Sequence, residues 1–136
     1  MTRHAQGLLD TRTLVLIGRL PDGDALPAHP LISAITLAEL SVGPLVAVSE
    51  AERSARQAHL QQAEADFDPL PFDAEAARAF GQVAASLRRS GRTTSARTHD
   101  AMIAATAIAN GLPLYTANPR DFRDIDGLEV VALDVP

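Results

Sequence analysis

The sequence contains no cysteine, no lysine and no tryptophan, and each absence narrows what the chain can do. Without cysteine there are no disulfides, no thiolate metal sites and no thiol nucleophile. Because aromatic residues make up only 4% of the chain, base stacking on aromatic rings is not expected to dominate any recognition of nucleic acid. No apolar run approaches the ~20 residues that a membrane-spanning helix needs, so no membrane contact is expected.

What is present indicates a globular protein. The chain has 136 residues, of which 46% are hydrophobic and 21% are charged, and this is enough apolar material to bury one substantial core. No internal repeat, low-complexity tract or linker-like stretch divides the sequence, so we expect a single domain over residues 1–136. Asp10 comes too early to leave room for the apolar core of a signal peptide, and we therefore expect a cytoplasmic protein.

The charges are unevenly distributed along the chain. A net charge of −5 at pH 7 argues against a surface that attracts nucleic acid everywhere. All 12 basic residues are arginine, and the acid-free stretch between Ala76 and His99 contains Arg78, Arg88, Arg89, Arg92 and Arg97. Planar guanidinium groups suit phosphates, which favours a local basic ridge here. The alternative is that Arg88 and Arg89 only complement the C-terminus of a helix.

Short apolar runs alternate with helical patterns. Strands are predicted at residues 8–9, 31–35, 67–72, 112–116 and 128–133, and residues 21–30 are predicted to form a loop. Helices are predicted over 14–20, from Thr36 to Gly43, from Ser49 to about Asp66, from Asp73 to near Gly91, and over 100–110, the last one buried on both sides. The alternation predicts an α/β fold with a mainly parallel sheet, in which ligands bind beyond the carboxyl ends of the strands.

Polar residues follow several of these strand ends. Asp10 comes directly after the first strand, Glu39 lies one turn into the helix after the second, and Asp100 opens the buried helix. Asn118 and Asp121 follow a later strand. If the strands are parallel, these side chains can gather at one edge of the sheet, where several carboxylates repel one another unless protons or a cation offset the charge.

Clustered carboxylates favour hard divalent cations such as Mg²⁺ or Mn²⁺, with the remaining coordination positions left to water and phosphate. A site of this kind activates water and stabilises an in-line displacement at phosphorus. Each acid also has a structural explanation. Thr36 and Glu39 have the spacing of a capping box, Asp10 suits a helix N-cap, Asp100 complements a helix dipole, and Asp121 fits a turn. The pattern alone therefore indicates only an acidic, metal-binding α/β domain.

The histidines and the missing motifs exclude other sites. No His-x-x-x-His or Glu-x-x-His pair occurs, so a zinc site is not expected, and the glycine-rich phosphate-binding motifs are absent. His99, next to Asp100, is a candidate base or substrate contact. A surface role is favoured for it, because neighbouring residues on a helix face different directions.

Three segments also resemble a known family. They are LLDT at 8–11, SAITLAEL at 33–40 and HDAMIAATAIANGLPLYTANPRDF at 99–122, and the last is the most specific. Together they resemble the PIN-domain ribonucleases, and more closely the toxins of VapBC toxin–antitoxin pairs. The resemblance runs from Leu8 to about Val131, and it implies that residues 1–136 form a single PIN-like domain, a three-layer α/β/α sandwich around a mainly parallel sheet.

The resemblance also implies roles for individual residues. By position, Asp10, Glu39 and Asp100 would ligate Mg²⁺, or Mn²⁺ in its place. The fourth catalytic position is open between Asn118 and Asp121, since many relatives carry an acid where this chain has the asparagine. Two further polar residues would hold carboxylates or water from behind the site, namely Thr11 and Thr116.

The activity implied is that of a metal-dependent endoribonuclease, the toxin of a type II toxin–antitoxin pair, which hydrolyses phosphodiester bonds in structured RNA such as tRNA or rRNA. RNA phosphates would be guided by Arg88, Arg89, Arg92 and Arg97. The family also implies a cognate antitoxin and a homodimer. The alternative is a catalytically silent PIN-like module that binds metal or protein, and the neutral Asn118 is its main support.

Overall fold

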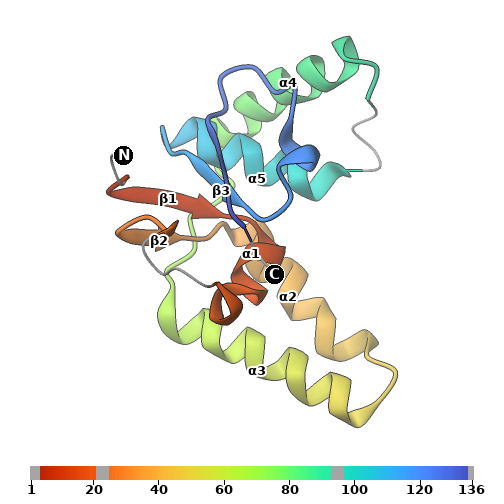
Figure 1. Cartoon of the computed structure of the whole chain (residues 1–136). Helices are drawn as coiled ribbons and strands as arrows, with labels where there is room; N and C mark the ends of the chain where they lie inside the picture. The colour runs from red at the N-terminus through yellow and green to blue at the C-terminus, as the bar shows by residue number, and fades with distance from the viewer. Residues whose placement is uncertain (1–3, 21–24, 93–96, 135–136) are drawn as a thin grey trace.

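A computed structural model describes residues 4–20, 25–92 and 97–134 (Figure 1). Its centre is a four-stranded parallel sheet in the order β2-β1-β3-β4. The strands are β1 (Gln6–Leu9), β2 (His29–Leu31), β3 (Leu114–Thr116) and β4 (Val130–Ala132). The parallel sheet predicted from the alternating pattern is confirmed.

Helices cover both faces of the sheet (Figure 1). On one face lie α4 (Ala74–Arg89) and α5 (Thr98–Ala109), and on the other lie α1 (Thr11–Val15), α2 (Ala34–Val42) and α3 (Glu50–Asp66). Short 3-10 turns complete the fold: η1 (Ile17–Arg19), η3 (Gly43–Val46) and η5 (Pro119–Phe122). We call the hairpin of α2, η3 and α3 the arm, because it extends away from the sheet in Figure 1.

Two apolar clusters fill the space on either side of the sheet. Leu8 and Leu114 point into the cluster under α4 and α5, whereas Leu9 and Tyr115 point into the cluster against α1, α2 and α3. Successive side chains of a strand face opposite sides, so adjacent apolar residues build both cores. This arrangement confirms the three-layer α/β/α sandwich.

The burial of α5 follows from its composition. Its small and apolar side chains pack against both the sheet and α4, and Ile103, Ala104 and Ala105 are fully buried. Gly111 ends the helix with a φ of +64°, a conformation that favours glycine. The prediction that this helix is buried on both sides is confirmed.

Two predicted strands differ from the structure. The strand expected at 31–35 is shifted towards the N-terminus, so that His29 and Pro30, predicted in a loop, belong to β2. Proline is tolerated there because β2 is an edge strand. The strand expected at 67–72 is reduced to a single bridge between Ser33 and Leu70. The prolines on both sides of Leu70 have no N–H to donate, so the ladder does not extend.

The start of α2 also differs from the sequence prediction. The N-cap is Ser33, whose hydroxyl accepts a hydrogen bond from the Thr36 amide at 3.2 Å. Thr36 therefore lies inside the helix, and its assignment as the first residue of a capping box is wrong. The predictions for residues 21–24 and 93–96 lie outside the described residues. Within the described part of the chain, no helix is long and apolar enough to cross a membrane.

Candidate active site

Asp10 lies at the carboxyl end of β1 and is bonded from two sides. Its Oδ1 accepts a hydrogen bond from the Thr13 amide at 3.2 Å, which makes it the N-cap of α1. Its Oδ2 accepts a hydrogen bond from the Thr116 hydroxyl at 2.9 Å. Only 5% of the residue is exposed, and this burial raises the pKa of its carboxyl group, although the hydrogen bonds oppose the shift. Asp10 can therefore cap α1 and also belong to the group of Asp10, Glu39, Asp100 and Asp121, which we call the acidic cluster.

Two buried threonines tie the ends of β1 and β3 together. The Thr116 hydroxyl, besides donating to Asp10, accepts a hydrogen bond from the Asn118 amide at 2.9 Å. The Thr13 hydroxyl accepts one from the Ala117 amide at 3.0 Å. Both threonines are fully buried, so these bonds fix where the chain turns after β3. Thr13 was not predicted as a site residue, since no pattern in the sequence around it indicates a contact with Ala117.

Glu39 reaches the same region from α2. Its Oε1 accepts a hydrogen bond from the Thr11 hydroxyl at 2.6 Å, and the same hydroxyl lies 3.0 Å from that of Thr36. Its Oε2 lies 3.5 Å from Nδ1 of His99, a side chain that is 65% exposed. Because Ser33 is the N-cap of α2, the alternative that Glu39 serves in a capping box is wrong. Its two carboxylate oxygens instead face residues of two other helices, Thr11 of α1 and His99 of α5.

Asp100, in the first turn of α5, shows that the acids form one cluster. Its pKa is raised to about 6, first by burial and then by the negative charges of Asp121, Asp10 and Glu39. These side chains come from four separate segments, yet each is near enough to disfavour ionisation of Asp100. The carboxylates predicted to gather at the carboxyl edge of the sheet therefore influence one another there.

The corner near η5 contains both candidates for the fourth position. The side-chain amide of Asn118 donates a hydrogen bond at 2.8 Å to Oδ2 of Asp121. Oδ1 of Asp121 accepts a hydrogen bond from the guanidinium group of Arg97, just before α5. The asparagine and the aspartate thus lie side by side, and only Asp121 contributes charge.

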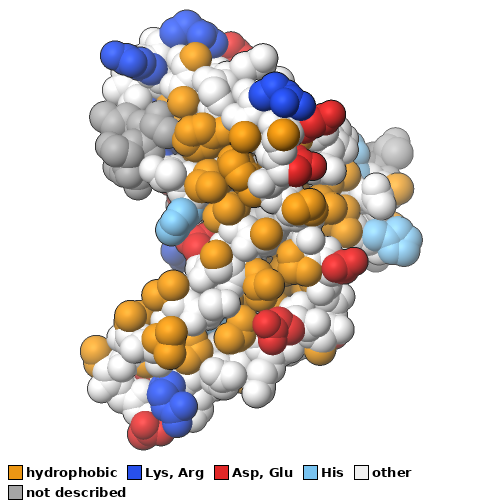
Figure 2. All heavy atoms as spheres, turned by 180° about the vertical axis from the view of Figure 1, so that it is seen from behind, with side chains coloured by type: hydrophobic (Ala, Val, Ile, Leu, Met, Phe, Trp, Pro, Cys, Tyr) orange, Lys and Arg blue, Asp and Glu red, His pale blue; other side chains and the backbone are white. Residues whose placement is uncertain are grey.

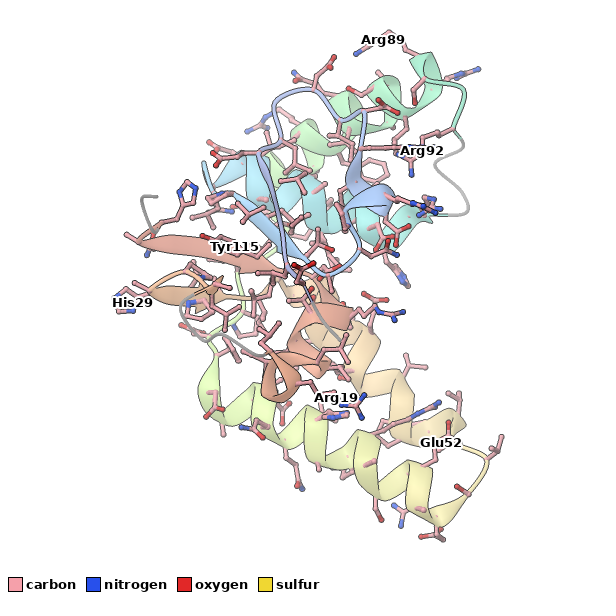
Figure 3. All side chains as sticks on the ribbon, viewed as in Figure 1. Arg19, His29, Glu52, Arg89, Arg92 and Tyr115 are labelled. Carbon is pink, nitrogen blue, oxygen red and sulfur yellow. The ribbon has the colours of Figure 1, made fainter. Side chains whose placement is uncertain are left out.

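The four arginines predicted to contact phosphates have different surroundings from one another. Arg97 alone among them has a contact with an acid of the cluster in the described part of the chain. Arg92 donates to the carbonyl groups of Arg120 and Arg123, beside η5. Arg89 pairs with Asp126 at 2.8 Å near the end of α4, and Arg88 is exposed on the same helical turn (Figure 3). Their role in contacting phosphates stays a prediction.

The surface is hollowed at this edge. Seen from behind, it is notched between the α4–α5 layer and the arm, and a histidine and acidic side chains lie together in the notch (Figure 2). A separate apolar groove of about 310 Å³ runs between α1, η1 and α3, with Leu14, Leu40 and Ala63 among its lining. None of the acids of the cluster lines that groove.

The donor atoms of the cluster suit a divalent cation. Carboxylate oxygens are the hard ligands that Mg²⁺ and Mn²⁺ prefer. The raised pKa of Asp100 indicates negative charge that is not fully compensated, and a cation would offset it. Among the described residues, no three carboxylate, imidazole or thiol side chains already stand together in a geometry that holds an ion.

The chain is similar to known proteins over the region that contains these acids. Residues 9–128 match the family model of the PIN domain, and this range includes all the acids of the cluster. The chain is 37% identical over 134 residues to "Ribonuclease VapC5" of Mycobacterium tuberculosis, which covers 97% of this chain and 96% of that protein. It is 36% identical over 98 residues to the "tRNA(fMet)-specific endonuclease VapC" of Shigella flexneri, which covers 71% of this chain and 70% of that protein.

The fold is similar to a solved structure as well. The crystal structure of VapBC-5 from Mycobacterium tuberculosis, a member of the VapBC family of toxin–antitoxin systems, superposes with a TM-score of 0.82 and 34% identity. The match covers 95% of this chain and 99% of that chain. The two chains therefore share the same overall fold.

Proposed function

The chain belongs to the PIN-domain family and, within it, to the VapC ribonuclease toxins of VapBC toxin–antitoxin systems, and we propose that the acidic cluster is its catalytic centre. The observation that carries this proposal is the convergence of Asp10, Glu39, Asp100 and Asp121 from four segments, with the raised pKa of Asp100 as its consequence. Carboxylates crowded in this way are stable when a cation shares the site, and they are a poor arrangement for a purely structural role.

Three of the acids, Asp10, Glu39 and Asp100, are proposed to hold Mg²⁺, or Mn²⁺ in its place. When bound, the ion supplies an activated water and stabilises negative charge at phosphorus. The chain's own contribution is to orient the acids beforehand. Thr116 fixes one oxygen of Asp10, and Thr11 fixes one oxygen of Glu39, so each carboxylate keeps its other oxygen for the site.

Asp121 is proposed to fill the fourth acidic position, with Asn118 as its positioning residue. The asparagine amide donates to Oδ2 of Asp121 and carries no charge of its own. This arrangement weakens the case for a catalytically silent module, which rested on the loss of an acid at residue 118. The acid lies three residues further along the chain and is near enough to raise the pKa of Asp100.

The proposed substrate is a structured RNA, tRNA or rRNA. Support comes from the relative of Shigella flexneri, whose name specifies a tRNA. With few aromatic residues, recognition would depend on shape and on contacts with phosphates. Arg97, which is bonded to Asp121, and Arg92, which is bonded to the carbonyl group of Arg120, are the candidates beside the acids. Arg88 and Arg89, at the end of α4, would contact phosphates further along the RNA.

The proposed protein partners are a cognate antitoxin and a second copy of the chain. Support comes from the toxin–antitoxin system to which the similar structure belongs. The arm also presents apolar side chains to solvent: Leu45 is 84% exposed and Val48 is 93% exposed. Exposed apolar side chains gathered at one end of the arm favour a contact surface over a solvated end (Figure 2).

The test of the catalytic proposal uses purified chain, freed of antitoxin, incubated with bulk tRNA and with total RNA in Mg²⁺ or Mn²⁺. Discrete fragments are expected, and they should disappear with EDTA and in Asp100→Asn. Glu64→Gln, which removes one charge from an exposed site on α3, is the matched control and should cleave normally. Intact RNA in the presence of folded, metal-bound protein would favour the silent module instead.

A further inference from the structure

Arg97 is an arginine that bonds directly to one of the acids of the cluster. It lies immediately before α5, and its guanidinium group binds Oδ1 of Asp121. The two side chains are 38% and 27% exposed, so the pair is partly withdrawn from water. Because Asn118 donates to the other oxygen of Asp121, both carboxylate oxygens are engaged by donors of the chain itself.

The influence of Arg97 extends beyond its partner. Its guanidinium group also interacts electrostatically with Asp100, the acid of the cluster three residues further along the chain. The guanidinium group thus supplies positive charge at the place where the cluster needs a cation. A divalent ion bound by the same acids would be repelled by the positive charge of Arg97.

Among the described residues, a second arginine–aspartate pair between separate segments provides a comparison. Arg89 and Asp126 are 63% and 81% exposed, and Arg89 lies near the end of α4 (Figure 3). A pair so exposed is screened by water and contributes little. The two pairs have the same chemistry, but only the pair of Arg97 and Asp121 shares its acid with the cluster.

We propose that Arg97 is an internal counter-ion, which neutralises the acidic cluster while no metal is bound and turns towards an RNA phosphate when a divalent cation replaces it. This inference rests on the proposed function and deepens it. The exchange is physically reasonable because a guanidinium group on a long side chain can leave one oxyanion for another without a change in the backbone. Phosphate offers the same bidentate geometry as a carboxylate.

The proposal predicts effects of opposite sign in a single variant. Arg97→Gln retains hydrogen-bond donors but removes the charge that competes with the ion. The dissociation constant of Mn²⁺, measured by titration calorimetry at pH 7.5, is expected to fall about threefold to tenfold, the effect of one partly exposed charge pair. KM for cleavage of bulk tRNA is expected to rise by a similar factor, with kcat changed less.

Two matched variants separate charge from structure. Arg97→Lys retains the charge and should bind Mn²⁺ as the wild-type protein does. Arg53→Gln makes the same substitution in the exposed pair of Arg53 and Glu50 on α3 and should change neither quantity. A merely structural role of Arg97 would weaken Mn²⁺ binding in Arg97→Gln, because the acids would be less well positioned.

The outcomes are distinct. Unchanged or weaker Mn²⁺ binding in Arg97→Gln would overturn the counter-ion proposal, whatever happens to RNA. Tighter Mn²⁺ binding with an unchanged KM would overturn its phosphate-binding half. If neither protein cleaves RNA while Arg97→Gln binds Mn²⁺ more tightly, the counter-ion stands and the catalytic proposal fails.

Discussion

Polar side chains form two kinds of network in this molecule, one along α3 and one at the carboxyl edge of the sheet. Along α3 the partners are three or four residues apart: Ser49 with Glu52, Glu50 with Arg53, and Gln62 with Asp66. At the sheet edge they are far apart in sequence, 28 residues for Thr11 with Glu39 and 106 for Thr116 with Asp10. Local bonds stabilise a helix, whereas long-range bonds between buried groups fix elements relative to one another.

The two networks are therefore expected to differ in role: the bonds along α3 support the fold, and the bonds at the sheet edge support function. The exposed pairs on α3 are screened by water and are each worth little. The bonds at the sheet edge hold carboxylates that burial and mutual repulsion make costly, as the raised pKa of Asp100 shows. Carboxylates grouped at such a cost are more typical of functional sites than of structural ones, so variants at the edge are expected to affect activity far more than variants on α3.

The largest effect is expected from Asp10→Asn. Asparagine caps a helix as well as aspartate does, so α1 should persist while the cluster loses a proposed metal ligand. Cleavage of tRNA, measured as kcat/KM under Mg²⁺, should fall about a thousandfold or more, because a bound metal supplies several kcal/mol of stabilisation.

Asp73→Asn is the matched control for Asp10→Asn. Asp73 is the N-cap of α4, where it accepts a hydrogen bond from the Ala76 amide at 3.0 Å, and it has no place in the cluster. The same substitution there should leave kcat/KM unchanged. Equal losses in the two variants would mean that a disturbed fold, and not the acidic cluster, limits activity.

A smaller effect is expected from Thr116→Val. The substitution keeps the shape of the buried side chain but removes the hydroxyl that bonds Asp10 and the Asn118 amide. Residues that orient a metal ligand typically contribute about tenfold to a hundredfold in activity. Two buried groups also lose a partner, so the free energy of unfolding should fall by about 1–3 kcal/mol.

Denaturant unfolding and tRNA cleavage, measured on the same preparation of Thr116→Val, check both expectations. The two losses need not be proportional. An active enzyme of lowered stability would show that the carboxylate of Asp10 finds its position without the threonine.

The local network was predictable from the sequence, and the long-range one was predictable only in part. The start of α3 after Ser49, the N-cap Asp73 and the buried α5 all follow from spacings within one or two turns. The placement of Asp10, Glu39 and Asp100 near one another followed from the parallel sheet, because parallel strands present their carboxyl ends at one edge.

The remaining contacts depend on how helices pack. The pairing of Arg97 with Asp121 spans 24 residues, and the bond from the Ala117 amide to Thr13 spans 104. No spacing in the sequence encodes either contact. Thr36 shows the converse error: a capping-box pattern was present, but the hydroxyl of Ser33 took the capping position and left Glu39 to bond Thr11.

The acidic cluster should also be visible in the pH dependence of stability. Asp100 has a pKa of about 6 in the folded protein against an ordinary value of 3.8, so the folded state binds a proton more readily than the unfolded state. Its ionisation therefore costs stability as the pH rises from about 4 to 6, and the full cost is present above that. In Asp100→Asn this cost is absent.

The measurement is thermal unfolding of wild type and Asp100→Asn in EDTA at pH 7.5 and at pH 4. With an allowance for the partial exposure of Asp100, the variant should be more stable by about 1 kcal/mol at pH 7.5, or about 2–5 °C in Tm. At pH 4 the difference should nearly vanish. An equal gain at both pH values would exclude charge repulsion as its origin.

The smallest effect on activity is expected on α3, from Ser49→Ala. The substitution removes the hydroxyl that accepts the Glu52 amide at 3.1 Å, and the loss of an N-cap costs about 1 kcal/mol, a fall of about 2–5 °C in Tm. Activity below the melting temperature should be unchanged, because none of the bonds along α3 reaches an acid of the cluster. A loss of kcat/KM in the folded Ser49→Ala protein would contradict the separation of the two networks, and it would mean that the arm holds Glu39 in place through α2.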